Sequence, residues 1–283
     1  KPWIRRFERR ATRHLHWPCS PWHVLNVRTD IREFRRYTDM TYLTPGVIQT
    51  FTALLLAHVL ADFIFQTRWI VAHKRNVFVL LLHIAIVFCL TAAALGGVWE
   101  VAIPVAYAHF VIDGLRVWVL PERLRDTFGA FLGDQAAHLV TLAAAALLWP
   151  GAAGQSLWAP WLDIATVPAL VLSGFVLTVI AGGHAVGLLT ARFQLQMEAQ
   201  EQEGLRDAGR VIGQLERTLI FMFVMASQPA GVGFLIAAKS LYSFDKNHRL
   251  AQYVIIGTFS SFAWALAIAY ATRALLEIAG PTP

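Results

Sequence analysis

The sequence predicts an all-α, polytopic transmembrane helical bundle with about seven to eight membrane segments. Of its 283 residues, 57% are hydrophobic and 15% are charged, whereas a soluble domain carries about 25% charged residues. Apolar runs recur at roughly the 20 residues that a helix needs to cross a hydrocarbon core. The alternating pattern of membrane β-strands is absent from the sequence, so helices are the expected spans.

Seven apolar runs are long enough to be read as membrane helices. We expect these helices at 47–66, 77–95, 99–119, 130–149, 165–190, 211–227 and 251–277. A shorter apolar piece at 229–241 begins with a proline and contains Lys239, which favours a re-entrant or interfacial segment.

Composition divides the chain into three predicted parts. Residues 1–46 hold ten of the 24 Lys and Arg residues, interleaved with Trp and Phe. This basic arm is typical of a segment that docks on an anionic membrane surface or on a partner protein, and the adjacent membrane disfavours nucleic acid as its partner. A four-helix block is expected at 47–150 and a C-terminal transmembrane block at 151–283, with a polar linker at 194–210.

The basic residues of the loops predict an orientation in the membrane. The loops at 67–76 and 116–129 each carry three Lys or Arg residues, and the connections at 96–100 and 150–164 carry none. The positive-inside rule therefore puts the first two loops in the cytoplasm. The same rule draws the basic arm inside as well, and these two indications conflict, so the side of the arm stays open.

A set of ionisable side chains interrupts the apolar helices of the four-helix block. A carboxylate at mid-bilayer costs about 2.5–3.5 kcal/mol, so such residues normally face the bundle interior and pair with each other or bind a ligand. Three His–Asp pairs are spaced four residues apart and so share a helix face. The set comprises His58, Asp62, His83, His109, Asp113, Asp134 and His138.

All of these residues fall toward the end of the bundle that bears the basic loops. Imidazoles and carboxylates together are the ligands that Zn, Fe or Mn would need, so we expect a divalent metal there. The predicted ligands or their orienting partners are His58, Asp62, His83, His109, Asp113 and His138. An unligated Asp134 or Asp62 would act as the catalytic base. The alternative is that the His–Asp pairs only hydrogen-bond helices together.

The order of these residues also predicts a duplicated helical hairpin. A helix with His-x-x-x-Asp, a basic loop and a helix that opens with a histidine occur twice, first with His58, Asp62 and His83 and then with His109, Asp113 and His138. Repeated hairpins commonly place a ligand site at their interface.

In the C-terminal block, three basic residues are candidates for binding an anionic cofactor or lipid headgroup. Arg210, Arg217 and Lys239 would form this basic pocket, with glycines at 209 and 213 giving close backbone access. Anchoring at the membrane interface is the simpler interpretation of the same residues.

The residues of the four-helix block resemble a bacterial multi-pass membrane family catalogued as domain of unknown function 3307. The resemblance rests on residues 55–66, with the pattern His-x-x-x-Asp-Phe-x-x-Gln, and on residues 109–113 and 134–138. It implies a bacterial inner membrane location and a helical fold, and it names no reaction.

The sequence thus favours an integral membrane protein with a buried metal site near the cytoplasmic leaflet, used for hydrolysis of an amphiphilic substrate. Two alternatives remain open. One is a non-enzymatic subunit or assembly factor that docks a partner through residues 1–46, and the other is a transporter or proton-coupled carrier that uses the same polar residues as a relay.

Overall fold

The computed structural model describes residues 43–194, 199–243 and 248–280. These residues form helices joined by short turns, and they contain no strand. The predicted all-α fold is therefore confirmed. The predicted basic arm at 1–46 lies outside the described residues, apart from its last four positions.

The first hairpin begins with α2, whose amino end is capped by the hydroxyl of Thr44. Its last turn continues as a π-helical segment, η3, and a short helix, α3, fills the loop before the second long helix. Thr67 caps α3 and Asn76 caps α4 through side-chain oxygens that accept backbone N–H groups. The elements are α2 (Pro45–Leu60), η3 (Ala61–Phe65), α3 (Arg68–His73) and α4 (Val77–Ala94).

The second hairpin repeats this order of elements. A long helix again ends in a five-residue π-helical segment, a short helix again fills the loop, and Thr127 caps the second long helix. The elements are α5 (Trp99–Gly114), η4 (Leu115–Val119), α6 (Glu122–Arg125) and α7 (Phe128–Leu148). Each half of the block is therefore a helix, a π turn, a short helix and a second helix.

A shift of 51 residues superposes the key positions of the two hairpins in the sequence. It pairs His58 with His109 and Asp62 with Asp113, and it pairs the N-cap of α4 with the N-cap of α7. On this shift the counterpart of His83 is Asp134. The correspondence differs from the predicted one, which paired His83 with His138. The shift of 51 holds for the His–Asp pairs and for the starts of α4 and α7, whereas α2 and α5 start 54 residues apart.

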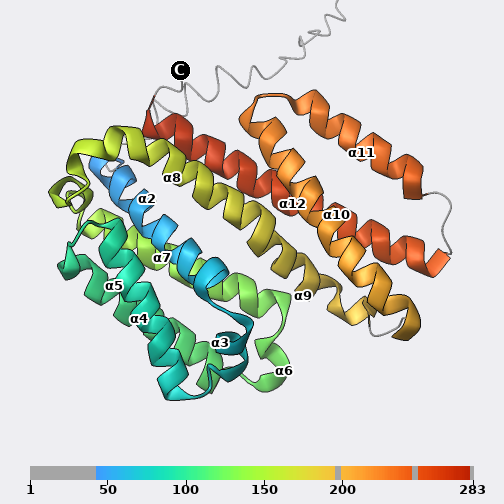
Figure 1. The fold of residues 1–283 in the computed structure, drawn as a ribbon, viewed down its shortest axis with the longest axis horizontal. Coiled ribbons are helices and arrows are strands. Elements are labelled where there is room, and N and C mark those ends of the chain that lie inside the picture. Colours follow the sequence, from blue (N-terminus) through green and yellow to red (C-terminus); the bar gives the residue numbers. More distant parts are fainter. Residues whose placement is uncertain (1–42, 195–198, 244–247, 281–283) are drawn as a thin grey trace, which may run out of the picture. The chain divides into compact units, whose positions relative to one another are not determined.

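The four long helices of the two hairpins pack as a bundle in which α2 and α5 each contact both α4 and α7 (Figure 1). An apolar core fills the end of the bundle where α4 turns into α5, and its members include Leu54, Val59, Leu95, Val105 and Leu142. The short helices α3 and α6 lie together at the other end (Figure 1). Apolar packing thus leaves the second end for the polar side chains.

The turn between α4 and α5 depends on a glycine. Gly96 has a φ of +55°, and its carbonyl accepts a hydrogen bond of 3.2 Å from the backbone of Leu157. A Cβ at this position would lie 2.6 Å from the Leu157 nitrogen. Only glycine allows both this conformation and this close approach.

The chain continues through two 3-10 turns into a long apolar helix that is interrupted by a third π-helical segment. Three further helices follow, and α12 packs on α8, α9 and α10. The elements are η5 (Ala153–Gln155), η6 (Ala159–Trp161), α8 (Leu162–Val176), η7 (Leu177–Ala181), α9 (Gly182–Gln194), α10 (Ala199–Met225), α11 (Pro229–Ser243) and α12 (His248–Ala279).

Six helices of the described residues are long and apolar enough to cross a membrane. They are Pro45–Phe65, Val77–Ala94, Trp99–Val119, Phe128–Leu148, Ala159–Ala191 and Ile255–Ala279. The chain is a multi-pass membrane protein.

The two remaining predicted segments have a different character. The run at 211–227 lies in the second half of α10, whose first half carries the charged residues of the predicted linker. Good helix formers such as Glu, Gln and Arg explain why residues 199–210 of that linker are helical. The piece at 229–241 lies in α11, where Pro229–Lys239 is a shorter apolar helix. The boundary predicted between residues 150 and 151 remains a prediction.

Candidate metal centre

The seven ionisable residues of the four-helix block gather at the end of the bundle opposite its apolar core. His58 and Asp62 come from the end of α2 and its π turn, and His109 and Asp113 come from the end of α5. The other three enter from the first half of α4 and of α7. Antiparallel hairpins bring these parts of the helices to the same level, and all but Asp62 are buried as whole residues. The sequence prediction that they converge agrees with these positions.

The centre of the cluster consists of two imidazoles between two carboxylates. His83 Nε2 lies 3.2 Å from His109 Nε2. Each of these nitrogens lies 3.4 Å from Asp62 Oδ1 and 3.5 Å from Asp113 Oδ2. Five separations among four ligand-type atoms therefore fall between 3.2 and 3.5 Å.

These separations match those between the ligand atoms of a metal ion. In a tetrahedral site with metal–ligand bonds of about 2.0–2.1 Å, neighbouring ligand atoms lie about 3.3–3.4 Å apart. The contact between His83 Nε2 and His109 Nε2 is also of hydrogen-bond length. Asp62 Oδ1, in contrast, makes no well-formed hydrogen bond, although two ring nitrogens lie 3.4 Å away. Five of the six separations among the four atoms therefore have the length expected between ligands of one ion.

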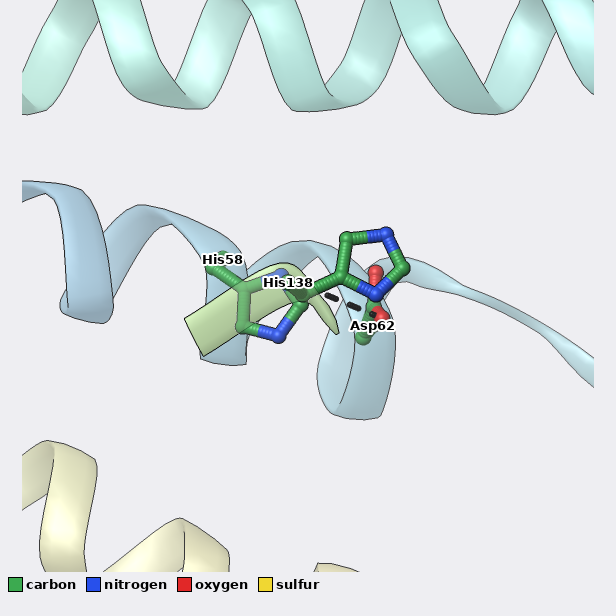
Figure 2. Close-up of side chains that lie close together, drawn as sticks. All are labelled: His58, Asp62 and His138. Carbon is green, nitrogen blue, oxygen red and sulfur yellow. Dashed lines mark ion pairs between the residues drawn. The ribbon is translucent and has the colours of Figure 1, made fainter. Parts of the chain in front are cut away.

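Two more histidines, His58 and His138, lie next to Asp62 and to His109. Figure 2 shows His58 and Asp62 on one ribbon with His138 beside them, and the dashed line marks the 3.9 Å ion-pair contact between His58 Nδ1 and Asp62 Oδ2. The rings of His58 and His138 are stacked with centroids 5.0 Å apart. Both side chains are buried among the four helices.

The hydrogen bond of His138 fixes which of its nitrogens can bind a metal. Its Nδ1 donates to the backbone carbonyl of Asp134 at 2.9 Å. A carbonyl only accepts, so Nδ1 carries the proton and Nε2 of the neutral ring presents a lone pair. That nitrogen is buried and has no hydrogen-bond partner, and neither nitrogen of His58 has one. A backbone bond of this kind commonly orients metal-bound histidine.

Three groups of these residues have the geometry to hold a metal ion. Within each group the ligand atoms lie within 4.8 Å of one another. The groups are His58, Asp62 and His138; Asp62, His83 and His109; and His109, Asp113 and His138. All six predicted metal ligands therefore belong to at least one group, and whether they bind an ion remains a prediction.

Two cations at the cluster were not among the predicted site residues. Lys74 Nζ lies 2.8 Å from Asp113 Oδ2, and Arg116 Nη1 lies 3.0 Å from Asp134 Oδ2. The Lys74 and Arg116 side chains are 12% and 24% exposed, against 3% and 4% for their partners. They therefore link the buried carboxylates to the surface. Only their positions in the basic loops marked them in the sequence.

Asp134, one of the two predicted bases, has one engaged oxygen and one free oxygen. Oδ2 accepts from Arg116 and, at 3.3 Å, from Gln135 Nε2, whereas the buried Oδ1 has no hydrogen-bond partner. Gln135 Nε2 also lies 3.5 Å from Asp62 Oδ2. One amide thus connects the two carboxylates that the sequence selected for catalysis.

Two of the three residues of the predicted basic pocket have other partners in the described part of the chain. Arg217 is buried and donates to the Val179 carbonyl at 3.2 Å and to the Ser261 hydroxyl at 3.0 Å. Lys239 pairs with Glu216. Arg210 is exposed, two helical turns before Arg217 on α10. An anion site formed by these three residues remains a prediction.

The fold and the cluster define a polytopic helical membrane protein with a buried His/Asp centre between two related hairpins. Residues 50–164 match the model of the family described as "Protein of unknown function (DUF3307)", and this part of the chain belongs to that family. The match covers both hairpins from within α2 to the start of α8. Neither a curated protein nor a solved structure matches the chain.

Proposed function

We propose that the protein is a metal-dependent hydrolase of an amphiphilic substrate, with a divalent ion held by His83, His109, Asp62 and Asp113. The observation that carries the proposal is the set of five separations of 3.2–3.5 Å among the four ligand atoms. A mixed set of imidazole and carboxylate ligands suits Zn, Mn or Fe.

The charges support a bound cation at this point. Three carboxylates, Asp62, Asp113 and Asp134, face two cations, Lys74 and Arg116. An excess of negative charge inside a membrane bundle is costly unless a cation compensates it. In their neutral form, the histidines between the carboxylates supply lone pairs to such a cation.

Asp134 is the proposed catalytic base. A divalent ion makes a bound water nucleophilic near neutral pH. The unpartnered Asp134 Oδ1 can accept the proton of that water, while Arg116 and Gln135 hold the other oxygen. The water oxygen forms the new bond to the acyl or phosphoryl centre, the bond to the leaving group breaks, and the leaving group takes a proton back from Asp134. Asp62 is proposed as a ligand because its Oδ1 faces both central histidines.

Lys74 and Arg116 are proposed to attract the anionic group of the substrate. They contact the carboxylates of the centre and are partly exposed. Trp69, Phe78 and Trp118 are exposed on α3, α4 and η4, at the same end of the bundle. Such aromatic side chains are favoured at the membrane interface. A molecule with a charged head and an apolar chain would satisfy both features.

The experiment compares wild type with Asp134→Asn in detergent micelles. Long-chain para-nitrophenyl carboxylate and phosphate esters serve as probes, after removal of metal by chelator and after reloading with Zn²⁺ or Mn²⁺. We expect turnover only with metal, and a loss of about 10²–10⁴-fold in Asp134→Asn at unchanged metal content. Asp163→Asn, an exposed aspartate on α8, is the control. Stoichiometric metal without turnover of either ester class would contradict the hydrolase.

A further inference from the structure

The second feature of the cluster is the pair of imidazoles that the proposed metal ion does not use. His58 and His138 lie beside the central histidines, and both belong with Asp62 to one possible ligand group. Three of their four ring nitrogens are buried without any hydrogen-bond partner. Each such unsatisfied group costs about 1–3 kcal/mol. Several such atoms in one place are typical of a site that a ligand or an ordered water occupies.

Asp62 has one oxygen on each side. Its Oδ1 lies 3.4 Å from His83 and His109, and its Oδ2 lies 3.9 Å from His58 Nδ1. Two of the three possible ligand groups share this one carboxylate, one with the central histidines and one with His58 and His138. A carboxylate between two ligand groups is suited to bridge two ions, which in two-metal sites lie about 3.5–4 Å apart.

The third ligand group connects the same two positions. His109 and Asp113 of the central set lie within ligand distance of His138, and the rings of His109 and His138 have centroids 4.1 Å apart. The tautomer of His138 directs its lone pair away from the Asp134 carbonyl. The unpartnered nitrogens therefore belong to one continuous cluster rather than to a separate pair.

From these contacts we propose that the centre binds two divalent ions bridged by Asp62, with His58 and His138 as terminal ligands of the second ion. This inference rests on the proposed function, since the first ion occupies the central position. Two ions give the centre an excess of positive charge over its carboxylates. It is therefore suited to a bridging hydroxide and an anionic phosphoryl or carboxyl group, as in two-metal hydrolysis.

The repeat explains why the second position differs from the first. His58 and His109 correspond under the shift of 51 residues, and so do Asp62 and Asp113. His83 corresponds to Asp134, which is held by Arg116. The second ion consequently has its extra imidazole from His138, one turn further along α7. Unequal ligand sets predict unequal affinities, with the second ion released first.

The test measures bound metal in the full-length protein purified in detergent, stripped with chelator, reloaded with Mn²⁺ and desalted. We expect two Mn per chain in wild type and one in the double variant His58→Ala, His138→Ala, by mass spectrometry of the metal. His184→Ala, a histidine of α9 outside the cluster, is the control and should retain two. One Mn in both wild type and double variant overturns the second position and leaves the first intact.

Two other results separate the inference from the function on which it rests. One Mn in wild type and none in the double variant overturns the inference, because a single ion would then use His58 and His138. No metal in any protein overturns the proposed function itself. If the double variant does not fold, the paramagnetic resonance spectrum of reloaded wild type decides. A spectrum of two coupled Mn²⁺ ions supports the pair, and an isolated six-line signal overturns it.

Discussion

Buried polar groups occur in two regions of this protein, and their hydrogen bonding differs between the two regions. In the α2–α7 bundle, His58, His138 and Asp62 each have a buried atom without a hydrogen-bond partner. In the helices α8–α12, the buried guanidinium of Arg217 donates to a backbone carbonyl and to a serine hydroxyl. Polar groups that find partners within the protein hold helices together, whereas those that converge without partners mark a place for a ligand.

The π turn of the C-terminal region shows how its polar groups are satisfied. The wide turn of η7 leaves carbonyl groups open to side-chain donors. Arg217 bonds the Val179 carbonyl, and Trp264 Nε1 donates to the Leu177 carbonyl at 2.9 Å. Gly182 allows the close approach of both side chains, since a Cβ there would lie 2.6 Å from the Trp264 ring. Two buried atoms of this region are exceptions: the hydroxyl of Thr178 in η7, and one oxygen of Glu216, whose other oxygen pairs with Lys239.

The largest expected effect comes from removing the carboxylate shared by the ligand groups. Asp62→Ala should weaken metal binding by at least about 100-fold, since it deletes a ligand rather than an outer partner. Equilibrium dialysis against Zn²⁺ or Mn²⁺ measures the change, with the exposed Asp163→Ala as control. Equal metal affinities of Asp62→Ala and Asp163→Ala would contradict a role of Asp62 as a ligand.

A substitution of Arg217 in the C-terminal region should lower the free energy of unfolding without changing the metal content. Arg217→Met leaves a buried carbonyl and a hydroxyl without their charged donor, which costs about 3 kcal/mol in free energy of unfolding. Titration with a denaturing detergent gives this value, and mass spectrometry gives the metal content. Arg217→Lys keeps the charge but loses the planar guanidinium, so its free energy of unfolding should lie between those of wild type and Arg217→Met. Loss of metal in Arg217→Met would show that the two regions are coupled.

A smaller effect is expected at the cations that face the cluster. Lys74→Met leaves the buried Asp113 without its cation, so the metal-free protein should lose about 1–3 kcal/mol. The metal-loaded protein should lose less, because the ion takes over the role of Lys74. Thermal unfolding with and without chelator measures both values. An equal loss in the two states would indicate that no ion lies next to Asp113.

The smallest effect is expected for Arg75, the residue after Lys74. Arg75 pairs with Glu122 in an exposed ion pair between the two short-helix regions. Exposed pairs contribute about 0–1 kcal/mol, so Arg75→Met should change the unfolding midpoint little and equally in both metal states. The same thermal unfolding series provides this comparison with Lys74→Met. A dependence on metal at Arg75 would extend the electrostatic influence of the centre to the surface.

The sequence predicts the helices and the polar stripes well because both follow from periodicity. Long apolar runs mark spans, and a spacing of four residues puts His58 with Asp62 and His109 with Asp113 on common helix faces. The family resemblance over the four-helix block is confirmed for residues 50–164. Ionisable side chains inside a membrane bundle are costly unless they face each other, so the polar faces of these helices are expected to meet.

The remaining features depend on geometry that spacing does not carry. The three π turns shift helix faces by one residue without an obvious sequence signal. Lys74 and Arg116 reach carboxylates on other helices, 39 and 18 residues away in sequence. The same limit applies to Arg217, which the sequence assigned to an anion pocket and which the structure shows bonded to two other helices.

The most direct measurement is the metal content of wild type beside the double variant His83→Ala, His109→Ala, each purified without chelator as a folded, monodisperse peak. Reloading with Zn²⁺ or Mn²⁺ precedes a second determination, and His184→Ala serves as the intramembrane control. We predict bound metal in wild type and in His184→Ala and the loss of at least one ion per chain in the double variant, because the central position loses two of its four ligands. Wild type without metal after reloading, or a double variant that retains the same content, would contradict a metal centre in this bundle.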